Sequence, residues 1–230
     1  MGPSARPRRA PVSREGTHSP PPGGALYLGV TGHRNITSSD GQVSELVAKE
    51  CRRLRRRWPD ARVSILSGLA EGADRLVVDV AREVLQASVV AVLPLPAAMY
   101  LRDFATTESR SEYEALVAGA RRVIQAPFLA SSRACARSGE PRNHQYAWAG
   151  AFIAKRSHIL FALWDGEPAR GTGGTAHVVS WFVDGAVPRP YRISFAPRLA
   201  TAPEHARELI HLNPRSHRVR RTTIKAPVHG

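Results

Sequence analysis

The sequence predicts an α/β protein with a Rossmann-like three-layer fold, in which helices cover both faces of a mostly parallel central sheet. Short apolar runs of strand length alternate with longer runs in which apolar residues recur at helical spacing. Glycine-containing loops follow three of the apolar runs, as they follow the strands of such folds. With 230 residues and a hydrophobic fraction of 43%, the chain can build one substantial domain with its own core.

Six segments have the composition of strands, because each is a short apolar run bounded by glycine, proline or polar residues. Their predicted limits are 25–31, 62–66, 88–95, 122–126, 157–164 and 191–195. The fifth run is the clearest central strand, since it is apolar over most of its length. The sixth is expected to lie at an edge of the sheet.

Five segments between the strands are predicted to be helices. In the first, Ser38, Ser39 or Asp40 can cap a helix that runs to about residue 57, where Pro59 ends it. Its apolar residues recur at helical spacing and are Val43, Leu46, Val47, Cys51 and Leu54. The other helices are predicted at 75–86, 112–119, 143–155 and 175–183.

The two ends of the chain differ in composition from the part between them. Residues 1–24 are rich in proline, arginine, serine and glycine and are predicted to be disordered. The folded domain is predicted to cover residues 25–196, and residues 197–230 to form a basic, weakly structured tail. Residues 127–141 form an irregular loop that is compatible both with a lid and with disorder.

Positive charge is concentrated at these ends. The formal net charge is +14, and more than half of it lies in residues 1–24 and 196–230. Basic tails can bind nucleic acid through its phosphates, but no aromatic residues are interleaved here for stacking on bases. Solubilising tails are therefore favoured, and nucleic acid is the weaker alternative partner.

The cysteines and the N-terminus indicate a cytoplasmic protein. Cys51 and Cys135 lie far apart and belong to no Cys-x-x-Cys pair, which is typical of reduced or buried thiols. The N-terminus lacks the apolar core of a secretory signal, and no apolar run approaches the roughly 20 residues of a membrane span. The histidines show no metal-ligand spacing, so we expect no metal. We also expect no cofactor and no membrane partner.

The segment Ser67-Gly68-Leu69-Ala70-Glu71-Gly72-Ala73-Asp74 joins the second strand to a helix. The first N–H groups of a helix lack internal partners and lie at the positive end of its dipole, so this turn predicts an anion site. Gly68 and Gly72 allow a close approach of backbone and ligand. Ser67 can donate to a phosphate, and Asp74 can accept from a ribose hydroxyl or favour the dipole. A tight turn that needs glycine for structural reasons would give the same pattern.

A second glycine-rich loop, Gly171-Thr172-Gly173-Gly174-Thr175, follows the fifth strand and precedes a helix. The amides of Gly173, Gly174 and Thr175 can form an anion-binding nest. No Gly-Lys-Ser/Thr follows, so the loop is not the phosphate-binding loop of ATPases.

The third loop, Thr31-Gly32-His33-Arg34, places a cation directly after the first strand, and arginine suits bidentate contact with a phosphate. His33 is either an acid–base group or a hydrogen-bonded turn residue. Asp165 follows the fifth strand and His177 lies one turn into the next helix, where each can line the recognition or reactive end of a ligand. Loops after parallel strands meet at one edge of the sheet, so the three loops predict one binding site.

These segments together resemble the SLOG superfamily, a Rossmann-like group that includes the DNA-processing protein DprA and the Lonely Guy phosphoribohydrolases. Residues 67–74 are similar to the Ser-Gly-x-Ala-x-Gly-x-Asp turn of DprA. Gly174-Thr175 is similar to the Gly-Thr in the Pro-Gly-Gly-x-Gly-Thr-x-x-Glu motif of the phosphoribohydrolases. Further similar segments at 29–34, 92–94 and 163–166 extend the resemblance over about residues 25–185, and it is closest to bacterial SLOG-like proteins of unassigned activity.

The resemblance implies a ligand that is a nucleotide or a nucleotide derivative. The chain departs from the phosphoribohydrolase motif at two positions, with Arg170 in place of its proline and Val178 in place of its catalytic glutamate. Valine cannot transfer a proton, so hydrolysis would require Glu71 or His177 as the catalytic residue.

We therefore expect the protein to bind or sense a nucleotide-derived small molecule, such as a nucleoside monophosphate, ADP-ribose or an NAD-like molecule. Two alternatives remain open, namely N-glycosidic hydrolysis of a nucleoside 5′-monophosphate and DprA-like binding of single-stranded DNA. A homodimer is compatible with the sequence. The expected ligand contacts are Gly32, His33, Arg34, Ser67, Gly68, Glu71, Gly72, Asp74, Asp165, Gly171, Gly173, Gly174 and Thr175.

Overall fold

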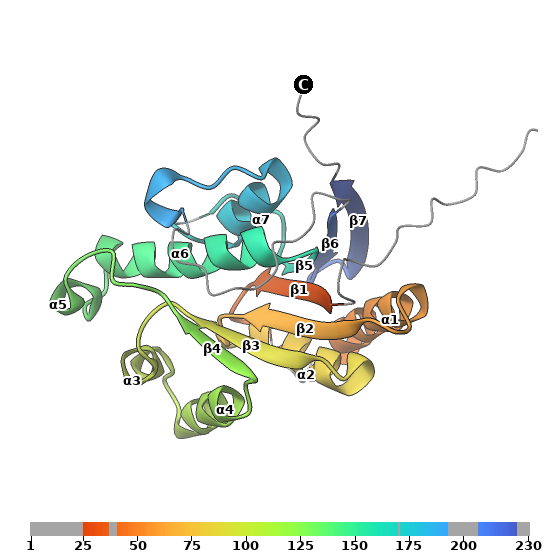
Figure 1. The fold of residues 1–230 in the computed structure, drawn as a ribbon, viewed down its shortest axis with the longest axis horizontal. Coiled ribbons are helices and arrows are strands. Elements are labelled where there is room, and N and C mark those ends of the chain that lie inside the picture. The colour runs from red at the N-terminus through yellow and green to blue at the C-terminus, as the bar shows by residue number, and fades with distance from the viewer. Residues whose placement is uncertain (1–24, 37–40, 170, 193–206, 225–230) are drawn as a thin grey trace, which may run out of the picture.

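The computed structural model describes residues 25–36, 41–169, 171–192 and 207–224. In these residues one sheet runs in the order β4-β3-β2-β1-β5-β6-β7 (Figure 1). Neighbouring strands are parallel except for the antiparallel pair β6 and β7. The predicted α/β fold with a mostly parallel sheet is therefore confirmed. The strands are β1 (Ala25–Gly32), β2 (Arg62–Ser67), β3 (Ser88–Leu93), β4 (Arg122–Gln125), β5 (Ile159–Leu163), β6 (Arg207–Asn213) and β7 (Arg218–Ile224).

The strand order reverses between β1 and β5. From β1 the chain builds the sheet outward through β2, β3 and β4, and then returns to place β5 on the other side of β1. Gly32 at the end of β1 pairs with Leu163 at the end of β5, and the His33 N–H donates to the Leu163 carbonyl at 3.0 Å. Loops that leave neighbouring strands in opposite directions open a crevice at such a point.

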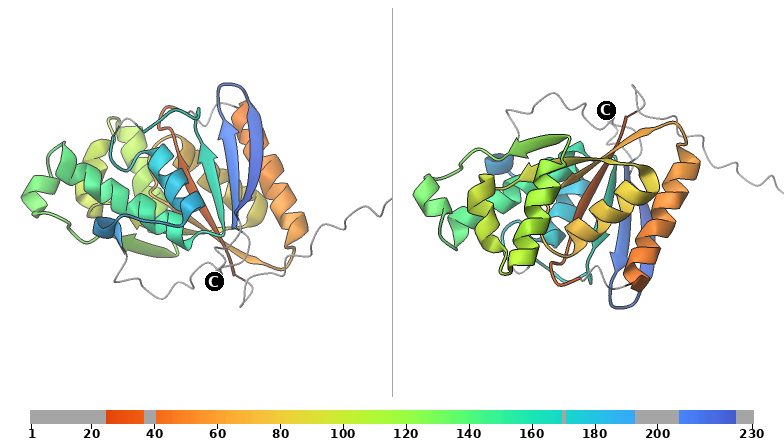
Figure 2. Two further views of the ribbon diagram at one scale, coloured as in Figure 1. Left: turned by 90° about the horizontal axis from the view of Figure 1, so that it is seen from above. Right: turned by 90° about the horizontal axis from the view of Figure 1, so that it is seen from below.

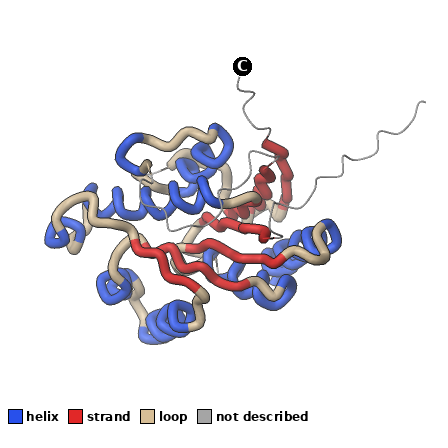
Figure 3. Tube along the Cα trace, viewed as in Figure 1, coloured by secondary structure: helices blue, strands red, loops and turns tan. Residues whose placement is uncertain are grey.

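Helices cover both faces of the sheet (Figures 1 and 2). One face carries α1 (Gly41–Arg57), α2 (Ala73–Leu85) and α4 (Thr107–Ala118), and the other carries α6 (Glu140–Arg156) and α7 (Thr175–Asp184). Short helical turns lie in the connections (Figure 3). These turns are α3 (Ala97–Tyr100), η1 (Leu101–Asp103), α5 (Ser132–Cys135) and η2 (Arg189–Tyr191).

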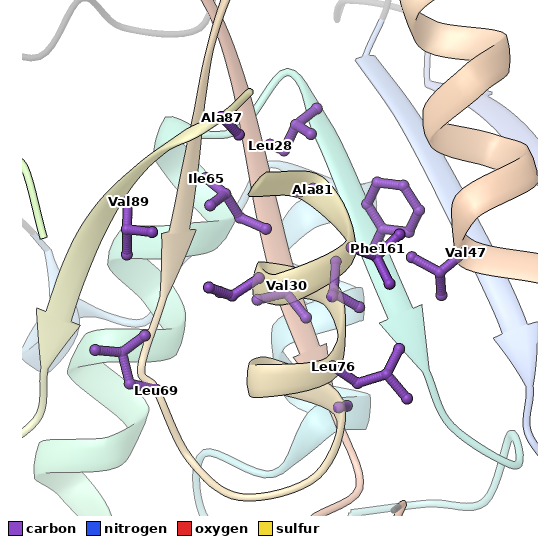
Figure 4. Packing of buried hydrophobic residues seen from close by; sticks show 14 of the residues in the cluster. Leu28, Val30, Val47, Ile65, Leu69, Leu76, Ala81, Ala87, Val89 and Phe161 are labelled. Carbon is purple, nitrogen blue, oxygen red and sulfur yellow. The ribbon is translucent and has the colours of Figure 1, made fainter. Parts of the chain in front are cut away.

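The core consists of aliphatic side chains from the parallel strands and the helices that cover them (Figure 4). Leu28, Ile65 and Phe161 of three adjacent strands are fully buried against α1 and α2. Parallel strands buried on both faces read as continuous apolar runs, which is why β1, β2, β3 and β5 were recognisable from sequence. In the first turn of α2, Ala73 and Leu76 pack in the same cluster, next to the polar residues Asp74 and Arg75.

The prediction of a weakly structured tail from residue 197 is wrong for residues 207–224, which form β6 and β7. Leu209, Ile210 and Leu212 are buried, but β7 lies at the edge of the described sheet and is mostly exposed and polar. The buried Glu208 of β6 pairs with Arg53 of α1, which ties the hairpin to the rest of the domain. The domain therefore extends beyond the predicted limit at residue 196.

Other predicted elements shift or fall outside the described residues. Between the predicted strand at 88–95 and the predicted helix at 112–119 lie α3, η1 and the start of α4, and the loop at 127–141 contains α5. Tyr191 belongs to η2 rather than to a strand. The tail 1–24, the capping positions 38–40 and residues 193–195 lie outside the described residues. Within the part that is described, no helix combines the length and apolar character needed to cross a bilayer.

Candidate functional site

A cavity of about 360 Å³ lies at the carboxyl edge of the sheet, at the point where the strand order reverses. All three predicted loops contribute to its lining, as do α6 and the loop after β3. The loop residues in its wall are Thr31, Gly32, Arg34, Gly68, Ala70, Asp74, Gly171, Thr172, Gly173, Gly174 and Thr175. The structure thus brings together most of the residues that were predicted to contact a ligand.

In the turn at residues 67–74, the carboxylate of Asp74 occupies the place where an anion was predicted to bind. Asp74 Oδ2 accepts from Ser67 Oγ at 2.9 Å and from the Ala70 N–H at 3.3 Å. The Leu69 N–H donates to Ser67 Oγ at 2.9 Å, and Ser67 is fully buried. Ser67 therefore holds Asp74 in place, and its hydroxyl does not reach the cavity in this geometry.

Asp74 is buried, with 8% of its surface exposed, and it lines the cavity. Burial raises the pKa of its carboxyl from the ordinary 3.8 to about 6, although hydrogen bonds from Ser67 and Ala70 and the nearby Arg34 act to lower it. A carboxylate that is held rigidly and is ionised at neutral pH is a suitable acceptor for a sugar hydroxyl.

Gly72 fixes the turn at 67–74 against the loop after β1. Its φ is +80°, and a Cβ atom here would lie 2.4 Å from the His33 carbonyl oxygen and 2.5 Å from the Arg34 carbonyl oxygen. The Ala73 N–H donates to the same His33 carbonyl at 3.0 Å. Gly72 is therefore required for loop-to-loop packing, and it does not line the first cavity.

We expect Gly72→Ala to lower the free energy of unfolding by about 3 kcal/mol or more, because the methyl group adds a clash to the backbone strain. Urea denaturation measures this loss. Gly185→Ala is the matched control, since Gly185 has a φ of +68° but nothing within 4 Å of its Cβ position. The control should lose only about 1 kcal/mol. Equal losses for the two variants would contradict the packing role of Gly72.

Arg34 is an exposed cation at the mouth of the cavity. Its guanidinium lies over the ring of Tyr146 at 5.7 Å from the centroid, and it makes no ion pair with a described carboxylate. Burial acts to lower the pKa of Arg34, but the surrounding tyrosine and aspartate groups outweigh it and raise the pKa above its usual value. The group therefore stays charged and has donors to offer to an anion.

The start of α7 faces the same cavity without a side-chain cap. Gly174 is the N-cap residue, and its neighbour Gly173 has a φ of +83° and packs so closely on α6 that a Cβ would lie 2.6 Å from the Ala147 nitrogen. The first two amides of the helix, from Thr175 and Ala176, lack intrahelical partners. With the dipole of a ten-residue helix behind them, these amides favour a negative charge.

A polar cluster that the sequence did not predict forms another part of the wall. Tyr100 and Tyr146 line the cavity together with Asn143, and they come from α3 and α6. Arg142 Nη2 donates to Asp103 Oδ1 at 2.5 Å, and the same aspartate accepts from the Tyr146 hydroxyl. Burial raises the pKa of Tyr146 to about 12, so its phenol stays protonated. Only the packing of α3 on α6 brings these residues together, and no local motif announces them.

His33 and Asp165 lie in an adjoining cavity of about 580 Å³. His33 Nε2 is 3.5 Å from Asp165 Oδ1, and Arg215 Nη2 is 3.5 Å from Asp165 Oδ2. The two cavities share Gly32, Arg34, Gly174 and Thr175 in their linings. Arg215 was not predicted, because it lies in the turn between β6 and β7, within the segment expected to be a tail.

The two residues predicted as catalytic do not line either cavity. Glu71 faces α4 and accepts from Ser109 Oγ. His177 is exposed and stacks on Trp181, with ring centroids 5.8 Å apart. Val178 of the same helix lines the first cavity instead, and its Cγ2 would lie 2.6 Å from a Cβ at Gly150 of α6. A catalytic role for Glu71 or His177 stays a prediction that this geometry does not support.

Among the residues that the structure describes, no group of three histidine, cysteine, aspartate or glutamate side chains is arranged to hold a metal ion. No protein-family model matches the chain. A comparison with the curated proteins gives no match either.

Proposed function

We propose that the protein binds a nucleotide-derived small molecule in the first cavity, as a sensor, and that it is a SLOG-like protein as the sequence resemblance suggests. The observation that carries the proposal is the convergence of Arg34, Asp74 and the uncapped start of α7 on one cavity. The cavity lies where open α/β sheets bind their ligands, and its volume of about 360 Å³ falls within the usual range for small-molecule sites.

The lining suggests how such a ligand would be oriented. A phosphate would lie at the start of α7, where the amides of Thr175 and Ala176 and the Arg34 guanidinium are available. A ribose hydroxyl would donate to Asp74. The nucleobase would lie beside Tyr146 and Asn143, since an aromatic face and an amide suit a flat heterocycle with polar edges.

Hydrolysis of the ligand receives less support. The reaction needs an acid–base group within reach of the glycosidic bond. Val178 lies in the wall at the position where the phosphoribohydrolase motif has its glutamate, and Glu71 and His177 lie outside the cavity. DprA-like DNA binding through the tails would depend on residues 1–24 and 225–230, which lie outside the described residues.

Isothermal titration with AMP, ADP-ribose, NAD and cyclic ADP-ribose tests the proposal, and chromatography of the same mixtures tests for turnover. We expect at least one of the four to bind without releasing free base. Failure of all four to bind would count against the proposed site. Release of free base would replace sensing by hydrolysis.

A further inference from the structure

The second cavity extends the ligand site on the far side of the phosphate position. It is lined by the loop after β5, by the β6–β7 turn and by the loop after β1. It adjoins the first cavity along Gly32, Arg34, Gly174 and Thr175. The residues proposed to hold a phosphate thus form a boundary between two compartments, and a mononucleotide in the first would leave the second open to a further group.

The chemistry of the second compartment differs from that of the first. Its lining includes His33, Trp164, Glu167 and Arg215, residues whose side chains combine donors, an acceptor and an indole ring. The Glu167 carboxylate is exposed and makes no ion pair with a described residue, so it is available to accept from hydroxyl groups. Charged and amphipathic groups of this kind suit a polyhydroxylated sugar more than a flat nucleobase.

The groups of this compartment are held in place by the backbone around them. The Trp164 indole N–H donates to the Glu167 carbonyl at 2.8 Å, and the Glu167 N–H donates to Asp165 Oδ1 at 3.2 Å. The Asn213 side-chain amide donates to the Asp165 carbonyl at 3.2 Å, which ties this loop to the end of β6. A preformed loop loses little conformational entropy when a ligand binds.

We propose that the ligand is a nucleoside diphosphate sugar, with the nucleoside in the first compartment, the diphosphate at Arg34 and the start of α7, and the terminal sugar in the second compartment. The inference rests on the proposed function, since it assumes that a nucleotide occupies the first cavity. It adds a specificity that the three loops alone do not predict, namely a preference for ligands that carry a sugar beyond the diphosphate.

The test compares ligands that differ only in the terminal sugar. Affinities are measured by isothermal titration for ADP, ADP-ribose and ADP-glucose, for UDP and UDP-glucose, and for AMP. We expect at least one sugar-bearing ligand to bind about 10-fold or more tightly than its own nucleoside diphosphate, because the second compartment adds new hydrogen bonds. Glu167→Ala should remove most of that gain and leave the affinity for AMP unchanged. Glu114→Ala, which removes an exposed carboxylate on α4, is the matched control and should change neither affinity.

The outcomes separate this inference from the proposed function. If AMP or a nucleoside diphosphate binds but no sugar-bearing ligand binds more tightly, the two-compartment inference is wrong and the proposed function stands. A gain in affinity that Glu167→Ala leaves intact also contradicts it. If none of the six compounds binds, and NAD and cyclic ADP-ribose do not bind either, the proposed function fails and the inference falls with it.

Discussion

Replacement of Arg34 by alanine is expected to weaken the binding of AMP or ADP-ribose about 10- to 100-fold. A charge-assisted hydrogen bond to a phosphate contributes roughly 1.5–3 kcal/mol, and each 1.4 kcal/mol corresponds to about a factor of 10 in affinity. Because Arg34 makes no ion pair with a described carboxylate, its removal should change the melting temperature little. Isothermal titration at low salt measures the effect.

Two further variants show whether the loss depends on the position of the charge or on charge alone. Arg34→Lys keeps the charge but loses the planar fork, so it should restore only part of the affinity. Arg56→Ala removes an exposed positive charge from the last turn of α1, at a residue that lines neither cavity, and should bind as the wild type does. Wild-type affinity in Arg34→Ala would show that the phosphate lies elsewhere.

The Asp74→Asn variant is expected to be more stable than the wild type at pH 7 and to bind AMP about 10-fold more weakly. The carboxyl has a pKa of about 6 in the folded protein and an ordinary value of 3.8, so ionisation of Asp74 opposes folding. A difference of this size corresponds to roughly 3 kcal/mol at most, and asparagine removes this penalty. The loss of affinity follows because a neutral amide accepts a hydroxyl hydrogen bond less strongly than a carboxylate.

The pH dependence of this effect has a definite sign. Between about pH 4 and pH 6 the folded state binds more protons at Asp74 than the unfolded state does, so the wild type loses stability as pH rises through this window. Below pH 4 the carboxyl is protonated in both states and the advantage of Asp74→Asn should disappear. Urea denaturation at pH 4, 5, 6 and 7 measures the difference. Asp60→Asn, at an exposed position, is the control that should show no such dependence. A constant difference across the series would contradict the raised pKa.

Much of the sheet was predictable because its strands are buried on both faces. The runs that became β1, β2, β3 and β5 are mostly apolar, and each is followed by glycine, proline or polar residues. The three loops at the carboxyl edge were predictable for the same reason, since their place follows from the parallel arrangement of these strands. The placement of Arg34 and Asp74 on one cavity needed no information beyond this topology.

The features of the structure that the sequence did not predict depend on contacts between distant segments. In β6 the charged Glu208 is buried beside its partner Arg53, and β7 is mostly exposed and polar, so the hairpin lacks the continuous apolar runs of the central strands. The cluster of Tyr100, Asp103 and Tyr146 unites residues 43 positions apart in the chain. The occupied anion position at Asp74 is a matter of hydrogen-bond geometry, which the spacing of serine and aspartate does not specify.

The arginines of β7 have a consequence for the behaviour of the protein in concentrated solution. An edge strand presents unpaired backbone groups that can add a strand from another molecule, which is a route to aggregation. Along β7 the residues Arg218, Arg220 and Arg221 are exposed, and of these three only Arg221 makes an ion pair with a described residue, Glu50. Two copies that approached each other edge to edge at β7 would bring like charges together. Charge repulsion between these arginines therefore opposes strand-to-strand pairing of two copies at β7.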